Sequence, residues 1–166
     1  MSRAFVKEGD QEEIPLIPPR AALPPGITNY VTPNGMEQLF IEQKQLEEEK
    51  ASLTVENETE HRIASTVLNG KLQLLQERIS SAVILKPNDS QRDAVRFGAT
   101  VTIRVMGKNQ VQKFQIVGVD EADVSQHKIA FTAPIAVALT GKKVGEIAQL
   151  NLGREVRQLK ITEISW

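Results

Sequence analysis

The spacing of apolar residues changes once along this chain, and that change constrains the fold more than any other feature. Between residues 32 and 85 apolar residues recur every three to four positions, which is the period of one face of an α-helix. After residues 86–90 they alternate with polar residues, as in residues 100–105 and 113–119, which is the period of a half-buried β-strand. The sequence therefore predicts a helical part followed by a β-sheet part.

The helical part contains two amphipathic stretches. Thr32 followed by Pro33 predicts the start of one helix, and Asn57 with Glu60 three residues later predicts the start of another. Their apolar stripes are narrow, so we expect an antiparallel hairpin over residues 32–85 that buries a single seam. The stripes consist of Met36, Leu39, Phe40, Leu46 and Leu53 in the first helix, and of Ile63, Val67, Leu68, Leu72, Leu75, Ile79 and Ala82 in the second. Gly70, inside the second helix, predicts a close approach between the helices.

Residues 1–31 differ from the rest in composition, because they hold five of the eight prolines of the chain. Proline fixes φ and lacks an amide donor, so we expect a proline-rich, flexible leader over residues 1–31. An arm that folds onto a partner is the alternative. Residues 86–96 are expected to link the hairpin to the final domain.

The β-sheet part, residues 97–166, contains the alternating stretches named above, a third short strand near residues 128–131 and a final hairpin across Gly153. Pro134 predicts one short helix after the third strand. We therefore predict an α+β fold, in which an N-terminal antiparallel helical hairpin precedes a small antiparallel sheet with one helix.

Composition excludes several classes of function. The chain has no cysteine, which excludes disulfides and thiolate zinc sites, and its two histidines lie far apart, so we expect no metal site. No run of apolar residues is long enough for a membrane helix, so we expect a soluble, cytoplasmic protein without a membrane partner. The net charge of −1 argues against a sequence-specific DNA-binding protein, whose domain would be strongly basic.

Four segments of the second half carry a family resemblance: residues 97–99, residues 114–118, residues 120–123 and residues 134–146. Their sequences resemble the C-terminal domain of the GreA/GreB transcription elongation factors. The resemblance implies an FKBP-like domain and, as partner, bacterial RNA polymerase, with the domain at the rim of the secondary channel and the hairpin inserted into it. The chain would then be a transcription factor that modulates elongation, backtracking or transcript cleavage and is not itself an enzyme.

Cleavage-active members of this family carry Gly-Asp-x-x-Glu-Asn at the hairpin tip, where two carboxylates can hold a magnesium ion shared with the polymerase active centre. The counterpart here is residues 52–57, in which Leu53 occupies the Asp position and Glu56 matches the Glu. Glu56 and Glu58 are the candidate tip carboxylates. The hairpin is also shorter than in the resembling factors, and both departures argue against cleavage. We expect no catalytic residue and no cofactor of the chain's own.

The resemblance also implies which residues contact the polymerase: the acidic loop before the short helix, and the start of that helix. Val137 stands where the family commonly has Arg. Structural roles for Pro134 and Ile135 are an equally good interpretation. The implied polymerase-binding residues are Asp120, Glu121, Ala133, Pro134, Ile135 and Ala136.

Three alternatives stay open at this point. A short-armed protein of the Rnk type, or an inhibitory competitor for the channel, would bind polymerase without cleavage. A peptidyl-prolyl isomerase would need an aromatic-lined pocket, for which this domain has few aromatic residues. A hairpin that mainly dimerises is the third; we expect a monomer.

Overall fold

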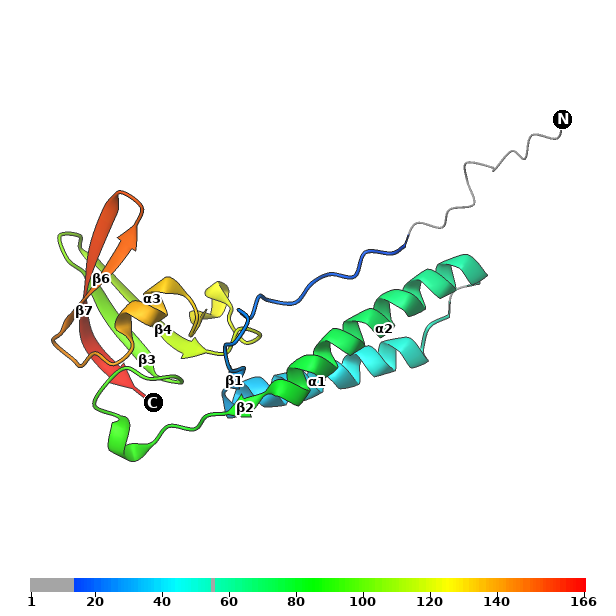
Figure 1. Ribbon diagram of the computed structural model, residues 1–166, viewed down its shortest axis with the longest axis horizontal. Helices are drawn as coiled ribbons and strands as arrows, with labels where there is room; N and C mark the ends of the chain where they lie inside the picture. Colours follow the sequence, from blue (N-terminus) through cyan, green and yellow to red (C-terminus); the bar gives the residue numbers. More distant parts are fainter. Residues whose placement is uncertain (1–13, 55) are drawn as a thin grey trace.

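The computed structural model describes residues 14–54 and 56–166 and shows two parts. A two-helix arm projects from one side of a small β-sheet domain, and the described part of the leader runs back along the arm (Figure 1). The predicted α+β architecture, with its helical hairpin first and its sheet second, is confirmed. None of the described helices is both long enough and apolar enough to cross a membrane.

The arm consists of α1 (Pro33–Ala51) and α2 (Glu58–Ser81). Both predicted helix starts are present: the Thr32 hydroxyl accepts a hydrogen bond from the Gly35 amide, and the Asn57 side chain accepts one from the Thr59 amide. With 19 and 24 residues, the helices are about 28 and 36 Å long at 1.5 Å per residue. The seam between them buries Leu39, Leu46, Leu68 and Leu75.

A two-stranded parallel sheet at the base of the arm was not predicted. Strand β1 (Tyr30–Val31) precedes α1, and β2 (Val83–Ile84) follows α2. Each strand has only two residues, which is too few for an alternation of apolar and polar residues to be recognised in the sequence. The pairing ties the end of the leader to the point where the chain leaves the arm.

The β-sheet domain has five strands in the order β5-β4-β3-β7-β6. A short 3-10 turn over Asp89–Gln91 precedes β3, and another over Val124–Gln126 precedes β5. The predicted short helix is α3 (Pro134–Leu139). The strands are β3 (Thr100–Val105), β4 (Gln110–Val117), β5 (Lys128–Ala130), β6 (Ile147–Leu152) and β7 (Glu155–Ser165).

The expectation of a wholly antiparallel sheet needs one correction. Strand β5 runs parallel to β4, with Gln115 opposite Lys128 and Val117 opposite Ala130. The cause is the connection between the two strands. Residues 118–127 carry the chain back to the level of Gln115 before β5 begins, so β5 then runs in the same direction as β4. The other three strand pairs are antiparallel.

The core of the domain is almost entirely aliphatic, built from alternate residues of β3 and β7 and from α3. Val101, Ile103 and Leu139 are completely buried, and Phe114 is the one aromatic residue in the buried cluster. Phe97 and Phe131 pack against this cluster and also join the leader to the domain. Tyr30 of β1 lies 6.1 Å from Phe97 and 5.7 Å from Phe131, measured between ring centroids.

Two glycines mark close approaches of the chain. A Cβ on Gly118 would lie 2.5 Å from the Tyr30 carbonyl oxygen, so the absence of a side chain lets β1 lie against the end of β4. A Cβ on Gly70 would overlap the side chain of Ile17. The close approach predicted at Gly70 therefore exists, but the segment that comes close is the leader and not the other helix.

Candidate functional site

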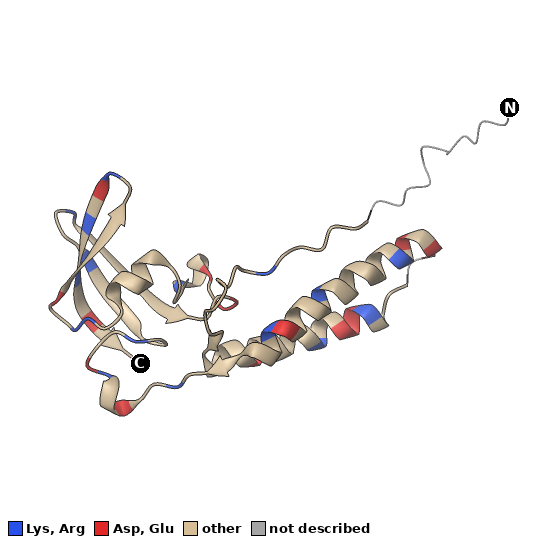
Figure 2. Cartoon of the chain, in the orientation of Figure 1, with Lys and Arg blue, Asp and Glu red and all other residues tan. Residues whose placement is uncertain are grey.

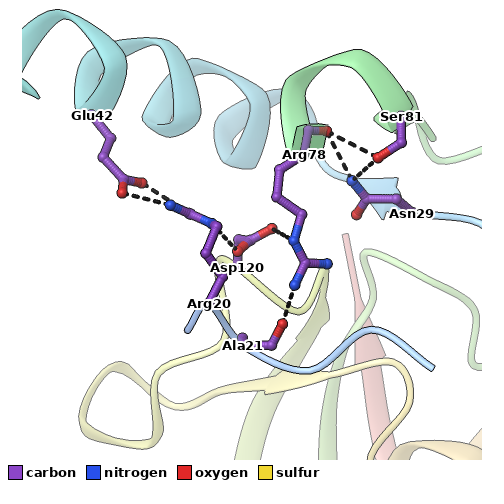
Figure 3. A network of polar contacts seen from close by, with 7 residues as sticks. All are labelled: Arg20, Ala21, Asn29, Glu42, Arg78, Ser81 and Asp120. Carbon is purple, nitrogen blue, oxygen red and sulfur yellow. Dashed lines mark hydrogen bonds and ion pairs between the residues drawn. The ribbon is translucent and has the colours of Figure 1, made fainter. Parts of the chain in front are cut away.

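The arm and the domain meet around the carboxylate of Asp120, in the turn after β4. Arg20 of the leader donates from Nε to Asp120 Oδ1 at 3.0 Å, and Arg78 of α2 places its Nε 3.6 Å from Asp120 Oδ2 (Figure 3). The Asp120 side chain is only 7% exposed. A carboxylate buried to this degree requires compensating charge, and the two guanidinium groups supply it.

Arg20 links three parts of the chain. Besides Asp120 in the domain, its guanidinium group holds the Glu42 carboxylate of α1 in a two-pronged contact, with N–O distances of 2.7 and 3.0 Å. The hydrogen bond that Arg20 donates to Glu42 raises the pKa of Arg20; burial lowers this pKa, and the charges of Asp120 and Glu42 raise it further. One leader residue thus holds both α1 and the domain.

Further contacts fix the leader to the end of α2. Arg78 donates to the carbonyl of Ala21, and the Asn29 side-chain amide donates to the Arg78 carbonyl at 3.0 Å and to the Ser81 hydroxyl at 3.1 Å. Asn29 is 3% exposed. The Arg78 carbonyl, in the last turn of α2, also accepts a longer bond of 3.3 Å from the Ser81 hydroxyl, so the Asn29 amide adds a second donor at this helix end.

A second connection runs through the start of α1. The Thr32 hydroxyl, which accepts from the Gly35 amide, donates to the buried carboxylate of Glu121. Lys128 of β5 lies 4.0 Å from the same carboxylate. The first turn of α1 and the loop after β4 therefore share one polar cluster.

The six residues predicted to bind polymerase fall into two settings. Asp120 and Glu121 point into the junction between arm and domain, where their carboxylates already have partners. At α3, Ala136 is completely buried, Ala133 and Ile135 are half-buried, and Pro134 is exposed. Pro134 is therefore the most accessible of the six. The polymerase contact of this set stays a prediction.

The hairpin tip is acidic on its outside and apolar within. Glu56 and Glu58 are both exposed, and red acidic segments lie near the ends of both helices in Figure 2. Leu53, which occupies the Asp position of the tip motif, is half-buried and packs against the seam of the hairpin. Residues 14–54 and 56–166 contain no group of three or more His, Cys, Asp or Glu side chains that could hold a metal ion. Val55 lies outside the described residues.

The sequence reasoning missed Arg20, Glu42 and Arg78. One signal for the first was present, because Arg20 is the only charged residue between positions 14 and 31. A single charge in a proline-rich apolar segment indicates a specific partner. Nothing local pointed to that partner, which lies 100 positions away.

We predict that Asp120→Asn destabilises the chain by about 1–3 kcal/mol, because the substitution leaves two arginines facing a neutral amide. Urea unfolding followed by circular dichroism measures the change. Asp93→Asn is the matched control, since Asp93 forms an ion pair with Lys143 on the surface, where both side chains are more than half exposed. Equal effects of the two substitutions would contradict the assigned role of Asp120.

Comparison with known proteins identifies the second half of the chain. Residues 89–166 match the family described as "Transcription elongation factor, GreA/GreB, C-term". GreA of Maricaulis maris is 34% identical over 99 residues, and GreA of Neisseria meningitidis is 35% identical over 100 residues. Each alignment covers 60% of this chain and 63% of the relative, so the chain spans somewhat less than two thirds of the relatives it matches.

Solved structures give a looser likeness. The crystal structure of GreA factor homolog 1 from Thermus thermophilus is 20% identical, with a TM-score of 0.40, over 84% of this chain and 100% of that one. A GreA/GreB factor from Nitrosomonas europaea is 19% identical, with a TM-score of 0.42, over 84% of this chain and 99% of that one. On these sequence matches, residues 89–166 form a GreA/GreB C-terminal domain, and this part of the chain is similar to the GreA transcription elongation factors.

Proposed function

We propose that this chain binds RNA polymerase through its C-terminal domain and places the helical arm in the secondary channel, where it changes elongation without stimulating transcript cleavage. The supporting observation is the junction: an arm of two helices is bonded to a GreA/GreB C-terminal domain through Asp120 and Glu121. An arm fixed in this way is delivered in one orientation when the domain docks.

The tip argues against cleavage on chemical grounds. A second magnesium ion in the polymerase active centre would need a pair of carboxylates from the arm, since hard cations prefer oxygen ligands. Leu53 offers no ligand atom, and its side chain packs against the hairpin seam instead of facing outward. Glu56 and Glu58 are exposed, so the tip remains acidic without the paired arrangement of cleavage-active members.

The length of the arm supports the same conclusion. At about 28 Å, α1 limits how far the tip extends from the base of the hairpin. A shorter arm occupies the channel without bringing its tip to the same depth as the longer arms of the resembling factors. An arm that occupies the channel without reaching the active centre would still exclude other channel-binding factors. This favours the alternative in which the protein is an inhibitory competitor.

An isomerase function has less support. A groove beside β4 and β5 is lined by Phe114, Ile129 and Ile135, and Phe114 is the only Phe, Tyr or Trp among the described residues that line it. Proline-binding pockets need more aromatic surface than one ring provides. We therefore expect no turnover of proline peptides.

The central prediction concerns backtracked elongation complexes. Adding the protein should leave the RNA unshortened while slowing cleavage by an added cleavage-active GreA, because both would occupy one channel. RNA length on a denaturing gel measures both effects. RNA shortening that is lost in Glu56→Ala would refute the non-cleaving mechanism, whereas unchanged GreA cleavage would refute channel binding.

A second prediction tests the docking face. Pro134→Glu should weaken binding to core polymerase at least tenfold, because it adds a charge to the exposed start of α3. The fold should remain intact, since a glutamate is favourable in the first turn of a helix. Pro87→Glu, in the exposed linker, is the matched control. Equal affinities in a fluorescence titration would remove α3 from the binding surface.

A further inference from the structure

The outer face of α1 carries apolar side chains that the rest of the described chain leaves uncovered. Phe40 is 50% exposed and Ile41 is 49% exposed, although the opposite face of the same helix is buried in the hairpin seam. With Met36 and Ile84 they line a shallow groove at the base of the arm. An apolar face of this kind, rimmed by charges, is typical of an interaction site.

The two charges that α1 itself places on this face have a symmetric arrangement. Glu37 and Lys44 are both exposed and lie on the same side of α1 as Phe40 and Ile41, because all four fall within one stripe of helical positions. Glu37 lies three residues before Phe40, and Lys44 lies three residues after Ile41. The midpoint between the two charges therefore falls between the two apolar residues.

This arrangement is complementary to itself when reversed. If a second α1 lies antiparallel across the first, with the two-fold axis between Phe40 and Ile41, each Glu37 faces a Lys44 of the other copy. The four apolar side chains then meet at the centre, and an ion pair closes each end. A two-fold interface requires a patch that matches itself, and this one does.

Strand β2 also favours contact with a second copy of the chain at this face. Its Val83 and Leu85 amides donate to carbonyls of the leader, so the Ile84 amide and carbonyl point toward the opposite edge. Ile84 is 47% exposed and lines the same groove, as does Lys86. Among the described residues, β2 pairs only with β1, and an open edge beside an apolar groove is suited to contact with another chain.

We propose that this face is a homodimer interface, in which the α1 helices of two copies pack antiparallel about an axis between Phe40 and Ile41. The inference does not depend on polymerase binding. The patch is small, so the dimer falls in the class of weak, transient complexes. Two arms paired in this way point in opposite directions, so only a dissociated copy could insert its arm into a channel.

The Lys44 side chain is available for this contact. Its partner within the chain is Glu48, 4.0 Å away on the next turn, and both side chains are more than two-thirds exposed. Surface pairs of this type contribute little, so exchanging Glu48 for Glu37 of a second copy costs little.

The test is sedimentation equilibrium of the full chain over concentrations up to roughly 1 mM, a range that covers weak complexes. The parent chain should associate to a dimer. Glu37→Lys and Lys44→Glu should each weaken association at least tenfold, and the double variant E37K/K44E should restore it, because the pairs are then reversed and still complementary. Glu77→Lys, on the exposed side of α2, is the control for net charge.

A mixing experiment gives the sharpest outcome. At positions 37 and 44 of α1 the Glu37→Lys chain carries two bases and the Lys44→Glu chain carries two acids, so the two chains should associate with each other more strongly than either does with itself. Circular dichroism checks that each variant keeps its helices. A parent chain that remains monomeric throughout, or a dimer that neither single reversal weakens, would overturn the proposal, as would a failure of the double variant to associate.

Discussion

A carboxylate of the domain that is buried against the arm requires compensating positive charge from the leader and the arm, and this requirement organises the molecule. Asp120 belongs to the domain, whereas Arg78 belongs to α2 and Arg20 to the leader. Removing Asp120 leaves two arginines side by side in the junction, and removing either arginine leaves the buried carboxylate with only one of its two compensating charges; both changes are costly. The angle between arm and domain therefore follows from where these three side chains can meet.

The leader takes part in that junction as a structural element. From Ile17, which lies on Gly70, to Tyr30, whose carbonyl lies against Gly118, it contacts both helices and the domain. Its prolines suit this role, because an extended segment with fixed φ loses little conformational entropy when it docks. The leader lies directly against Gly70 of α2 and Gly118 of the domain, where a side chain would prevent so close an approach.

The parts of the fold that sequence predicts are those with a repeating local signal. The helices, their caps at Thr32 and Asn57, and the strands of the domain all follow from period and from residue type over short windows. The direction of β5 and the two-residue strands at the base of the arm have no such signal, because they depend on how a connection runs in space. The junction is harder still, since Arg20 and Asp120 stand 100 positions apart. The family resemblance indicated that Asp120 and Glu121 matter, yet the placement of their carboxylates inside the junction came from the structure.

The junction holds the arm in one orientation relative to the domain, and a distance across the junction tests this directly. The chain has no cysteine, so spin labels at Glu60→Cys near the tip and Arg154→Cys in the turn between β6 and β7 would be unique. At a concentration where the chain is monomeric, double electron–electron resonance should give one narrow distance distribution, and adding Arg20→Ala should broaden it. A distribution that is already broad in the parent chain, or that Arg20→Ala leaves unchanged, would contradict the central claim.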